Sequence, residues 1–152
     1  LGVDALWLTP FYPSPQVDNG YDVANYLDVD PSYGTLEDVD NLIAAAHARG
    51  LRIILDMVFN HTSTQHPWFQ DAARPASPRR SFYIWRDGVD GSPPNNWCSK
   101  FGGSAWRWHA ASGQYYLHLF APEQADLNWE NPQVRDELKQ ICAFWADRGV
   151  DG

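Results

Sequence analysis

Three side chains able to bind a polar substrate or move a proton follow one short apolar run. Residues 51–55 have the composition of a strand in a parallel sheet, and Asp56, Asn60 and His61 come directly after them. A buried strand has no packing need for carboxylate, amide and imidazole groups. In parallel α/β proteins, functional groups gather where strands end at their C-terminal edge, because the loops open there. We therefore expect a strand, buried on both faces, that delivers Asp56 and His61 to a site.

A strand, a helix and a second strand are predicted to position these groups. Residues 3–9 are apolar, and Pro10 ends that strand. Thr35 is expected to cap a helix that ends at Gly50, with Glu37 and Asp38 in its first turn. Its apolar stripe consists of Leu36, Val39, Leu42, Ile43 and Ala46. Such a unit implies a parallel strand pair.

A second helix is predicted from Asn131 and Pro132 to Gly149. Its apolar stripe consists of Val134, Leu138, Ile141 and Trp145. The segment before it, residues 62–130, is much longer than an ordinary connection. We expect it to form a small subdomain, with a strand over residues 113–120 and its tryptophans in the core. Those tryptophans are Trp68, Trp85, Trp97, Trp106, Trp108 and Trp129.

Composition excludes several classes of function. The 152 residues suit one domain, and 44% hydrophobic residues suffice for a core. With 11 Lys and Arg against 19 Asp and Glu, the net charge of −8 argues against nucleic-acid binding. No apolar stretch is long enough to span a membrane. Cys98 and Cys142 have no metal or redox spacing, which favours a reducing, cytoplasmic location. Leu1-Gly2 resembles the end of a helix, so we expect an internal piece of a longer protein.

Five motifs together resemble the α-amylase family of glycoside hydrolases, in its oligo-1,6-glucosidase and α-glucosidase branch. Residues 2–10 resemble the second barrel strand of that family, and residues 18–22 (Asp-Asn-Gly-Tyr-Asp) the sugar-binding loop after it. Residues 56–61 resemble its Asp-x-x-x-Asn-His motif. Residues 93–97 and 101–106 resemble the inserted domain of α-glucosidases, and residues 124–128 resemble Gln-Pro-Asp-Leu-Asn, with Ala125 replacing proline.

The resemblance implies an α/β fold, a partial (β/α)8 TIM barrel. It would run from the second strand to the start of the fourth, with a small domain inserted after the third strand. Barrel residues would be 1–61 and 131–152, and the inserted subdomain 62–130. The implied reaction is retaining hydrolysis of α-1,6 or α-1,4 glucosidic bonds in short oligosaccharides. The nucleophile Asp and the acid/base Glu would lie beyond residue 152, so we expect the chain alone to be inactive.

By the same resemblance, His61 would donate to the 6-hydroxyl of the glucose at the cleavage site. Asp56 would pair with an arginine of the nucleophile strand and position it. Asp18 and Tyr21 would hold the non-reducing glucose, although Asp-Asn-Gly is also favourable in an exposed turn.

Phe101 and Phe120 would line the next sugar site, with Gln124 nearby; a role of these aromatics in the subdomain core is an open alternative. The expected ligand is a small oligosaccharide, with no nucleic acid or membrane as partner. We expect no cofactor and no metal ligands in this chain, and any Ca²⁺ or Mg²⁺ to be bound elsewhere in the protein.

Two alternative functions stay open. Trehalose synthase and sucrose isomerase are transglucosidases that share the equivalents of Asp18, Tyr21 and His61. Residues 93–97 and 101–106 favour the glucosidase over them. The ectodomain of an amino-acid transporter heavy chain is a non-enzymatic relative, and the intact loop at residues 18–21 argues against it.

Overall fold

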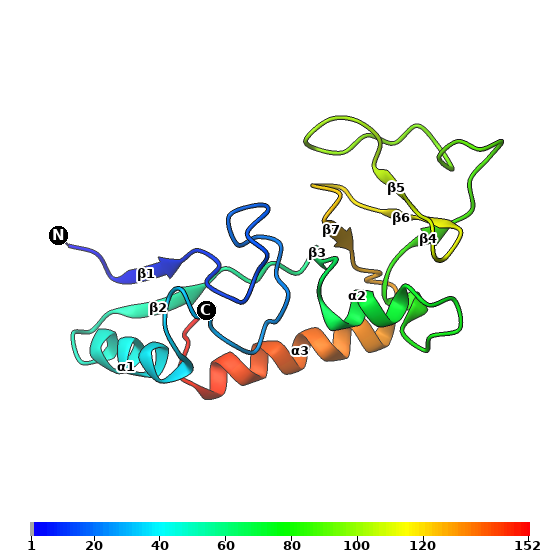
Figure 1. Cartoon of the computed structure of the whole chain (residues 1–152). Coiled ribbons are helices and arrows are strands. Elements are labelled where there is room, and N and C mark those ends of the chain that lie inside the picture. Colours follow the sequence, from blue (N-terminus) through cyan, green and yellow to red (C-terminus); the bar gives the residue numbers. More distant parts are fainter. Residues whose placement is uncertain (1) are drawn as a thin grey trace.

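The computed structural model describes residues 2–152, so the expectation for Leu1 falls outside the described part (Figure 1). The strands β1 (Ala5–Leu8) and β2 (Arg52–Leu55) are joined by the helix α1 (Leu36–His47), and the helix α3 (Pro132–Asp147) comes last. The segment between β2 and α3 contains β3 (His61–Ser63), α2 (Pro67–Ala72), the 3-10 helix η1 (Arg80–Phe82), β4 (Trp85–Arg86), β5 (Trp106–His109), β6 (Gln114–Leu117) and β7 (Gln124–Asp126).

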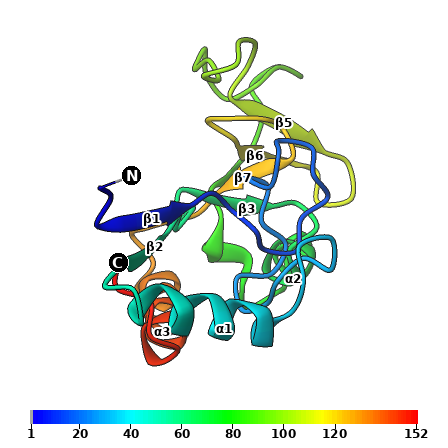
Figure 2. The ribbon, with the colours of Figure 1, turned by 90° about the vertical axis from the view of Figure 1, so that its left-hand side faces the viewer.

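The expected parallel pair is confirmed. β1 and β2 run parallel, with Ala5 opposite Arg52 and Leu8 opposite Leu55. The end of the chain runs beside β2 as a third extended segment. The Asp151 amide donates to the Ile53 carbonyl at 2.9 Å, and the Leu55 amide donates to the Gly152 carbonyl at 2.8 Å. The chain therefore contains three neighbouring extended segments, with α1 and α3 on the same side of them (Figure 2).

The helix α1 begins as its sequence predicts. The Thr35 hydroxyl accepts from the Asp38 amide, and the Asp38 carboxylate accepts from the Thr35 amide, which forms a capping box. The helix ends at His47, and the chain then turns through Gly50, whose φ of +71° favours glycine. Of the predicted stripe, Val39, Ile43 and Ala46 are buried, whereas Leu42 is exposed.

The helix α3 supplies the largest fully buried side chain. Asn131 caps it with Pro132 at the first position, and all four residues of its predicted stripe are buried. The Trp145 indole is completely buried and donates from Nε1 to the Tyr26 carbonyl at 2.8 Å. Its ring also meets the rings of Phe11 and Tyr12 at centroid distances of 5.5 and 5.9 Å. Trp145 thus anchors the loop between β1 and α1 to α3.

The prediction that β2 is buried on both faces is wrong for this chain. Ile53 and Leu55 are buried, while the alternate residues Arg52 and Ile54 are exposed. The helices α1 and α3 cover one face of the sheet (Figure 2), and within residues 2–152 no element packs on the other. The exposed indole of Trp7 in β1 agrees with this one-sided burial.

The two ends of the long segment are held together. β3 pairs antiparallel with β7, so that His61 lies opposite Asp126 and Ser63 opposite Gln124. Between these strands, β4, β6 and β5 form an antiparallel sheet in that spatial order. β6 confirms the predicted strand but is shorter than residues 113–120, because the chain bends at residues 119–120.

The prediction that the tryptophans of this segment are core residues is wrong for half of them. Trp85 and Trp106 are buried and Trp68 is half-buried. The exposed indoles are those of Trp97, Trp108 and Trp129. A sheet of three short strands has too little covered area to bury six indoles.

Within residues 2–152, no helix has the length and apolar character needed to cross a membrane.

The buried His66 gives a prediction on stability. Its Nδ1 accepts from the Trp68 amide at 3.1 Å and caps α2, and burial lowers its pKa to about 4. Because the folded pKa lies below the unfolded value, the unfolded chain takes up the extra proton between about pH 6.5 and pH 4. The stability contributed by neutral His66 is therefore present above pH 6.5 and is lost as the pH falls towards 4. The expected loss is about 3 kcal/mol.

Urea unfolding of the wild type and of His66→Asn at pH 7 and pH 4 measures this loss. Asparagine retains a capping oxygen but does not titrate in this range. We expect the free energy of unfolding to fall further in the wild type than in the variant. Equal falls in the two proteins would contradict the prediction.

Candidate active site

The loop between β1 and α1 is shaped by the buried Asp22. Its two carboxylate oxygens accept from the amides of Val17 and Asp18, each at 3.0 Å. Gly20 has a φ of +92°, and a Cβ atom there would lie 3.0 Å from the Pro10 carbonyl oxygen. These contacts fix the backbone that carries Asp18 and Tyr21. The exposed-turn alternative does not fit Asp18, which is half-buried.

Tyr21 connects this loop to the end of β2. Its hydroxyl donates to Asp56 Oδ2 at 2.9 Å, and this hydrogen bond is the main cause of the raised Tyr21 pKa. The Asp56 backbone is held on both sides, since its amide donates to Leu8 and its carbonyl accepts from the Tyr12 hydroxyl at 3.2 Å. Asp56 therefore lies at the C-terminal edge of the parallel pair, as its position after the strand predicts.

His61 lies beside Tyr21 and is held as a neutral imidazole. Its Nε2 is 3.0 Å from the Tyr21 carbonyl oxygen, which can only accept, so Nε2 carries the proton. Nδ1 then accepts from the Asn60 side-chain amide at 3.2 Å. Burial is the main cause of a lowered His61 pKa, which also favours the neutral form. Both ring nitrogens thus take part in hydrogen bonds. To donate to a sugar hydroxyl, Nε2–H must either break its hydrogen bond to the Tyr21 carbonyl or divide it between that carbonyl and the hydroxyl.

Gln124 is joined to Asp18 across the two halves of the chain. Its side-chain amide donates to Asp18 Oδ2 at 2.9 Å, and its oxygen accepts from the Ala121 amide at 2.9 Å. The residue is completely buried, so both ends of its amide are used inside the protein. This geometry gives Gln124 a positioning role towards Asp18.

The two predicted phenylalanines extend the site towards solvent. The Phe120 ring lies 5.2 Å from the His61 ring, centroid to centroid. The Phe101 ring meets Phe120 edge-on at 5.9 Å and is 63% exposed. An exposed ring is not a core ring, so Phe101 does not fit the core alternative. The structure therefore brings all the predicted site residues into one connected set.

Asp22 and Asp126 are supporting residues to which the sequence analysis gave no function, and Asn60 is a third, which it counted among the polar side chains after the strand without a role of its own. Asp126 is buried and accepts from the Leu119 amide at 2.8 Å, which fixes the chain beside Phe120. Burial raises its pKa to about 6, opposed in part by hydrogen bonds from Leu119 and Asn60. An acidic residue directly after a strand end or inside a short motif is the signal that could have found such residues.

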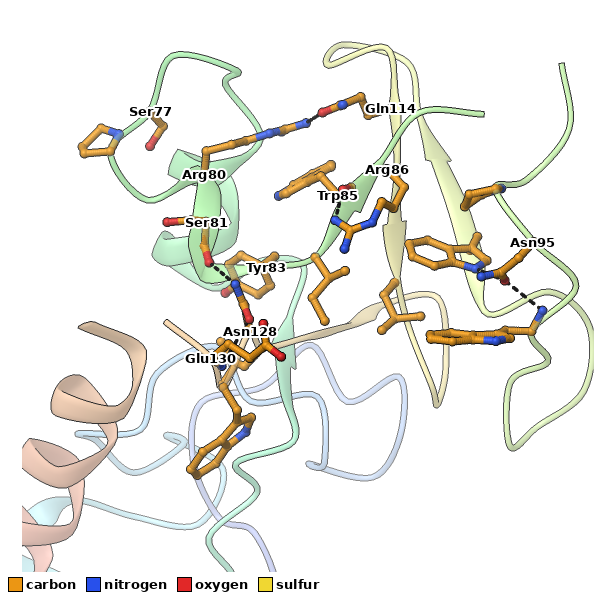
Figure 3. Close-up of a pocket in the computed structure, with 18 residues that line it drawn as sticks. Ser77, Arg80, Ser81, Tyr83, Trp85, Arg86, Asn95, Gln114, Asn128 and Glu130 are labelled. Carbon is orange, nitrogen blue, oxygen red and sulfur yellow. Dashed lines mark hydrogen bonds between the residues drawn. The ribbon is translucent and has the colours of Figure 1, made fainter. Parts of the chain in front are cut away.

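A large cavity lies apart from this site. It has a volume of about 920 Å³ and is lined by residues of η1, β4 and the following loop, together with residues 127–130 (Figure 3). The Arg80 guanidinium lies over the Trp85 ring, 3.5 Å from its centroid. Trp85 Nε1 is the one buried side-chain polar atom without a hydrogen-bond partner among residues 2–152. None of the predicted site residues lines this cavity, so its size does not mark the site.

The described residues contain no group of three or more His, Cys, Asp or Glu side chains arranged to hold a metal ion. Cys98 and Cys142 are both free and exposed. The side chains of the candidate active site supply two carboxylates, a phenol, a neutral imidazole and two aromatic rings. Such a set hydrogen-bonds hydroxyl groups and stacks on apolar faces.

The parallel strands, with polar side chains at their C-terminal edge, define a piece of an α/β enzyme domain. The family described as "Alpha amylase, catalytic domain" matches residues 1–152. The chain belongs to this family, which is built on the TIM barrel.

Three relatives illustrate the likeness. Trehalose-6-phosphate hydrolase of Escherichia coli K12 is 76% identical over all of this chain, which covers 28% of that relative. Oligo-1,6-glucosidase of Heyndrickxia coagulans is 52% identical over the same residues, again 28% of its length. The solved structure of trehalulose synthase from Pseudomonas mesoacidophila superimposes with a TM-score of 0.97 at 50% identity, covering 99% of this chain and 27% of that one. The chain thus spans about 28% of the length of the curated relatives it matches.

The Gln124–Asp18 contact gives a prediction on substrate binding. Gln124→Leu in the whole protein leaves the Asp18 carboxylate and the Ala121 amide without these partners. A lost hydrogen bond to a charged group costs about 1.5–3 kcal/mol, so we expect KM to rise at least about tenfold. Gln114→Leu is the matched control, because Gln114 also uses both ends of its amide, towards Arg80 and Asp87. Equal KM values for the two variants would contradict the prediction.

Proposed function

We propose that the whole protein is an exo-acting, retaining α-glucosidase. The supporting observation is the connected set of Asp18, Tyr21, Asp56 and His61, which suits one terminal glucose unit. Asp18 would accept from sugar hydroxyls, the Tyr21 ring would stack on the apolar face, and His61 would donate to the 6-hydroxyl. These residues bind and orient the sugar.

In this proposal the chain forms the second strand to the start of the fourth strand of the barrel. Residues 62–130 form the domain inserted after the third strand. The nucleophilic Asp and the acid/base Glu belong to other parts of the polypeptide, and Asp56 positions an arginine of the nucleophile strand. The carboxyl groups of that Asp and Glu would lie about 5–5.5 Å apart, as retention requires.

We further propose trehalose 6-phosphate as the substrate. Its support is the 76% identity to the Escherichia coli trehalose-6-phosphate hydrolase, against 52% to the oligo-1,6-glucosidase. The protein would then release glucose and glucose 6-phosphate. Oligosaccharides with α-1,6 or α-1,4 bonds are the alternative substrates, and transfer of glucose is the alternative reaction. The likeness to the trehalulose synthase structure supports glucose transfer.

The test uses the purified whole protein with trehalose 6-phosphate, isomaltose, maltose and sucrose. We expect the highest kcat/KM for trehalose 6-phosphate, and NMR should detect α-glucose as the first product, since retention preserves the anomer. β-Glucose as the first product would overturn the retaining mechanism. Isomerised sucrose as the main product would favour the transglucosidase. No turnover of any α-glucoside would overturn the assignment as an enzyme.

A further inference from the structure

The cationic side chains of the chain fall into two groups. Eight of the 11 Lys and Arg residues have a side-chain hydrogen bond or ion pair within residues 2–152. The three without such a partner in the described residues are Arg52, Lys100 and Arg107. Arg52 begins β2, at the opposite end of the strand from Asp56. Lys100 directly precedes Phe101, whose ring belongs to the candidate active site.

The backbone of Lys100 is fixed beside that site. Its amide donates to the Leu119 carbonyl at 2.8 Å. On one side, the Ser99 hydroxyl donates to the Phe120 carbonyl at 2.8 Å and accepts from the Phe101 amide at 3.1 Å. The Lys100 side chain is exposed, on a flexible four-carbon stem. The loop thus holds a cation one residue from Phe101 and opposite the chain that leads to Phe120.

The charged side chains that belong to the candidate active site are carboxylates. Asp18 and Asp56 contribute two carboxylates to it, Asp22 adds a buried one beneath the same loop, and the chain carries a net charge of −8. A phosphorylated sugar is a dianion near pH 7, so these charges repel it. Lysine binds phosphate as a point charge, which compensates for this repulsion.

We propose that Lys100 is a specificity-determining residue that binds the phosphate of the sugar leaving group. The inference rests on the proposed function, because it takes trehalose 6-phosphate as the substrate. Phe101 and Phe120 would then contact the glucose 6-phosphate unit, and Lys100 would neutralise its charge. The glucose held by Asp18 and Tyr21 carries no phosphate and does not need this residue.

The test compares two substrates in the whole protein, trehalose 6-phosphate and p-nitrophenyl α-glucoside, which lacks a phosphate. The measured quantity is the ratio of their kcat/KM values. In Lys100→Met we expect this ratio to fall about ten- to a hundredfold, the effect of losing a charged hydrogen bond, mainly through a higher KM for trehalose 6-phosphate. Glucose 6-phosphate should also inhibit the variant more weakly than the wild type. Arg107→Met is the matched control, since Arg107 lies in β5 and its side chain also has no hydrogen-bond or ion-pair partner within residues 2–152.

Each outcome of this test has a distinct meaning. A wild-type enzyme that cleaves trehalose 6-phosphate, with an unchanged ratio in Lys100→Met, would overturn the role of Lys100 and leave the proposed function standing. An equal fall in Arg107→Met would overturn it too, because the effect would then be one of overall charge. A wild type that cleaves only the unphosphorylated glucoside would refute the proposed substrate, and the inference with it.

Discussion

In the whole protein, His61→Ala is expected to lower kcat/KM by about ten- to a hundredfold. The reason is the arrangement of the ring, which is buried and neutral, with Nε2–H directed at the Tyr21 carbonyl. Removing it leaves the Tyr21 carbonyl and the Asn60 amide without their partner and removes the proposed donor to the sugar. Transition-state contacts to the glucose would be weakened, so kcat should fall along with kcat/KM.

Steady-state kinetics on p-nitrophenyl α-glucoside measures this change. His109→Ala is the control, because His109 also uses its Nδ1 in a hydrogen bond, to Ser112 in the β5–β6 turn. Circular dichroism of both variants checks that they are folded. If His61→Ala retained wild-type kcat/KM, the role proposed for His61 would be wrong.

The largest expected effect on stability is that of Trp145→Ala, a loss of about 3–5 kcal/mol in the free energy of unfolding. The side chain is completely buried, contacts the rings of Phe11, Tyr12 and Phe144, and donates to the Tyr26 carbonyl. Alanine would leave a cavity and an unpaired carbonyl at once. Because Tyr26 in turn places its hydroxyl 2.7 Å from the His61 carbonyl, the damage should extend to the site.

Thermal unfolding of the whole protein, together with its kcat, measures both effects. Trp108→Ala is the matched control, since that indole is about half exposed and should cost far less. Trp145→Phe separates the two contributions, because it refills much of the volume but leaves the Tyr26 carbonyl unpaired. Equal unfolding temperatures for Trp145→Ala and Trp108→Ala would refute the role of Trp145 as an anchor.

The helices and the parallel pair were predictable because local signals and packing agree there. Thr35 and Asn131 are caps in the sequence and in the structure, and the stripe from Val134 to Trp145 is buried throughout. The burial of β2 was not predictable from its composition, since the sequence does not say which elements cover each face. The same reason accounts for Trp97, Trp108 and Trp129, whose hydrophobicity says nothing about the size of the sheet beneath them.

The sequence motifs named the residues of the candidate site, but they did not predict the hydrogen bonds that join those residues. Residues Asp18, Tyr21, Asp56 and His61 follow from motifs, and the structure brings them together. The hydrogen bond from Gln124 to Asp18 joins residues that are 106 positions apart, which no local pattern encodes. The tautomer of His61 likewise depends on the carbonyl of Tyr21, a partner that only the folded chain defines.

Residues 64–123 form an excursion, that is, an inserted segment that leaves the barrel chain at β3 and returns to it at β7. Its two ends meet because β3 and β7 pair as neighbouring strands of one two-stranded ladder. Exposed loops within such an excursion can be exchanged or lengthened while the chain outside it keeps its path. His61 and Gln124 lie in the ladder itself, whereas Lys100 and Phe101 lie on the excursion. Recognition of the glucose and recognition of its partner sugar would thus be able to evolve independently. One barrel framework could in this way serve enzymes with different leaving groups.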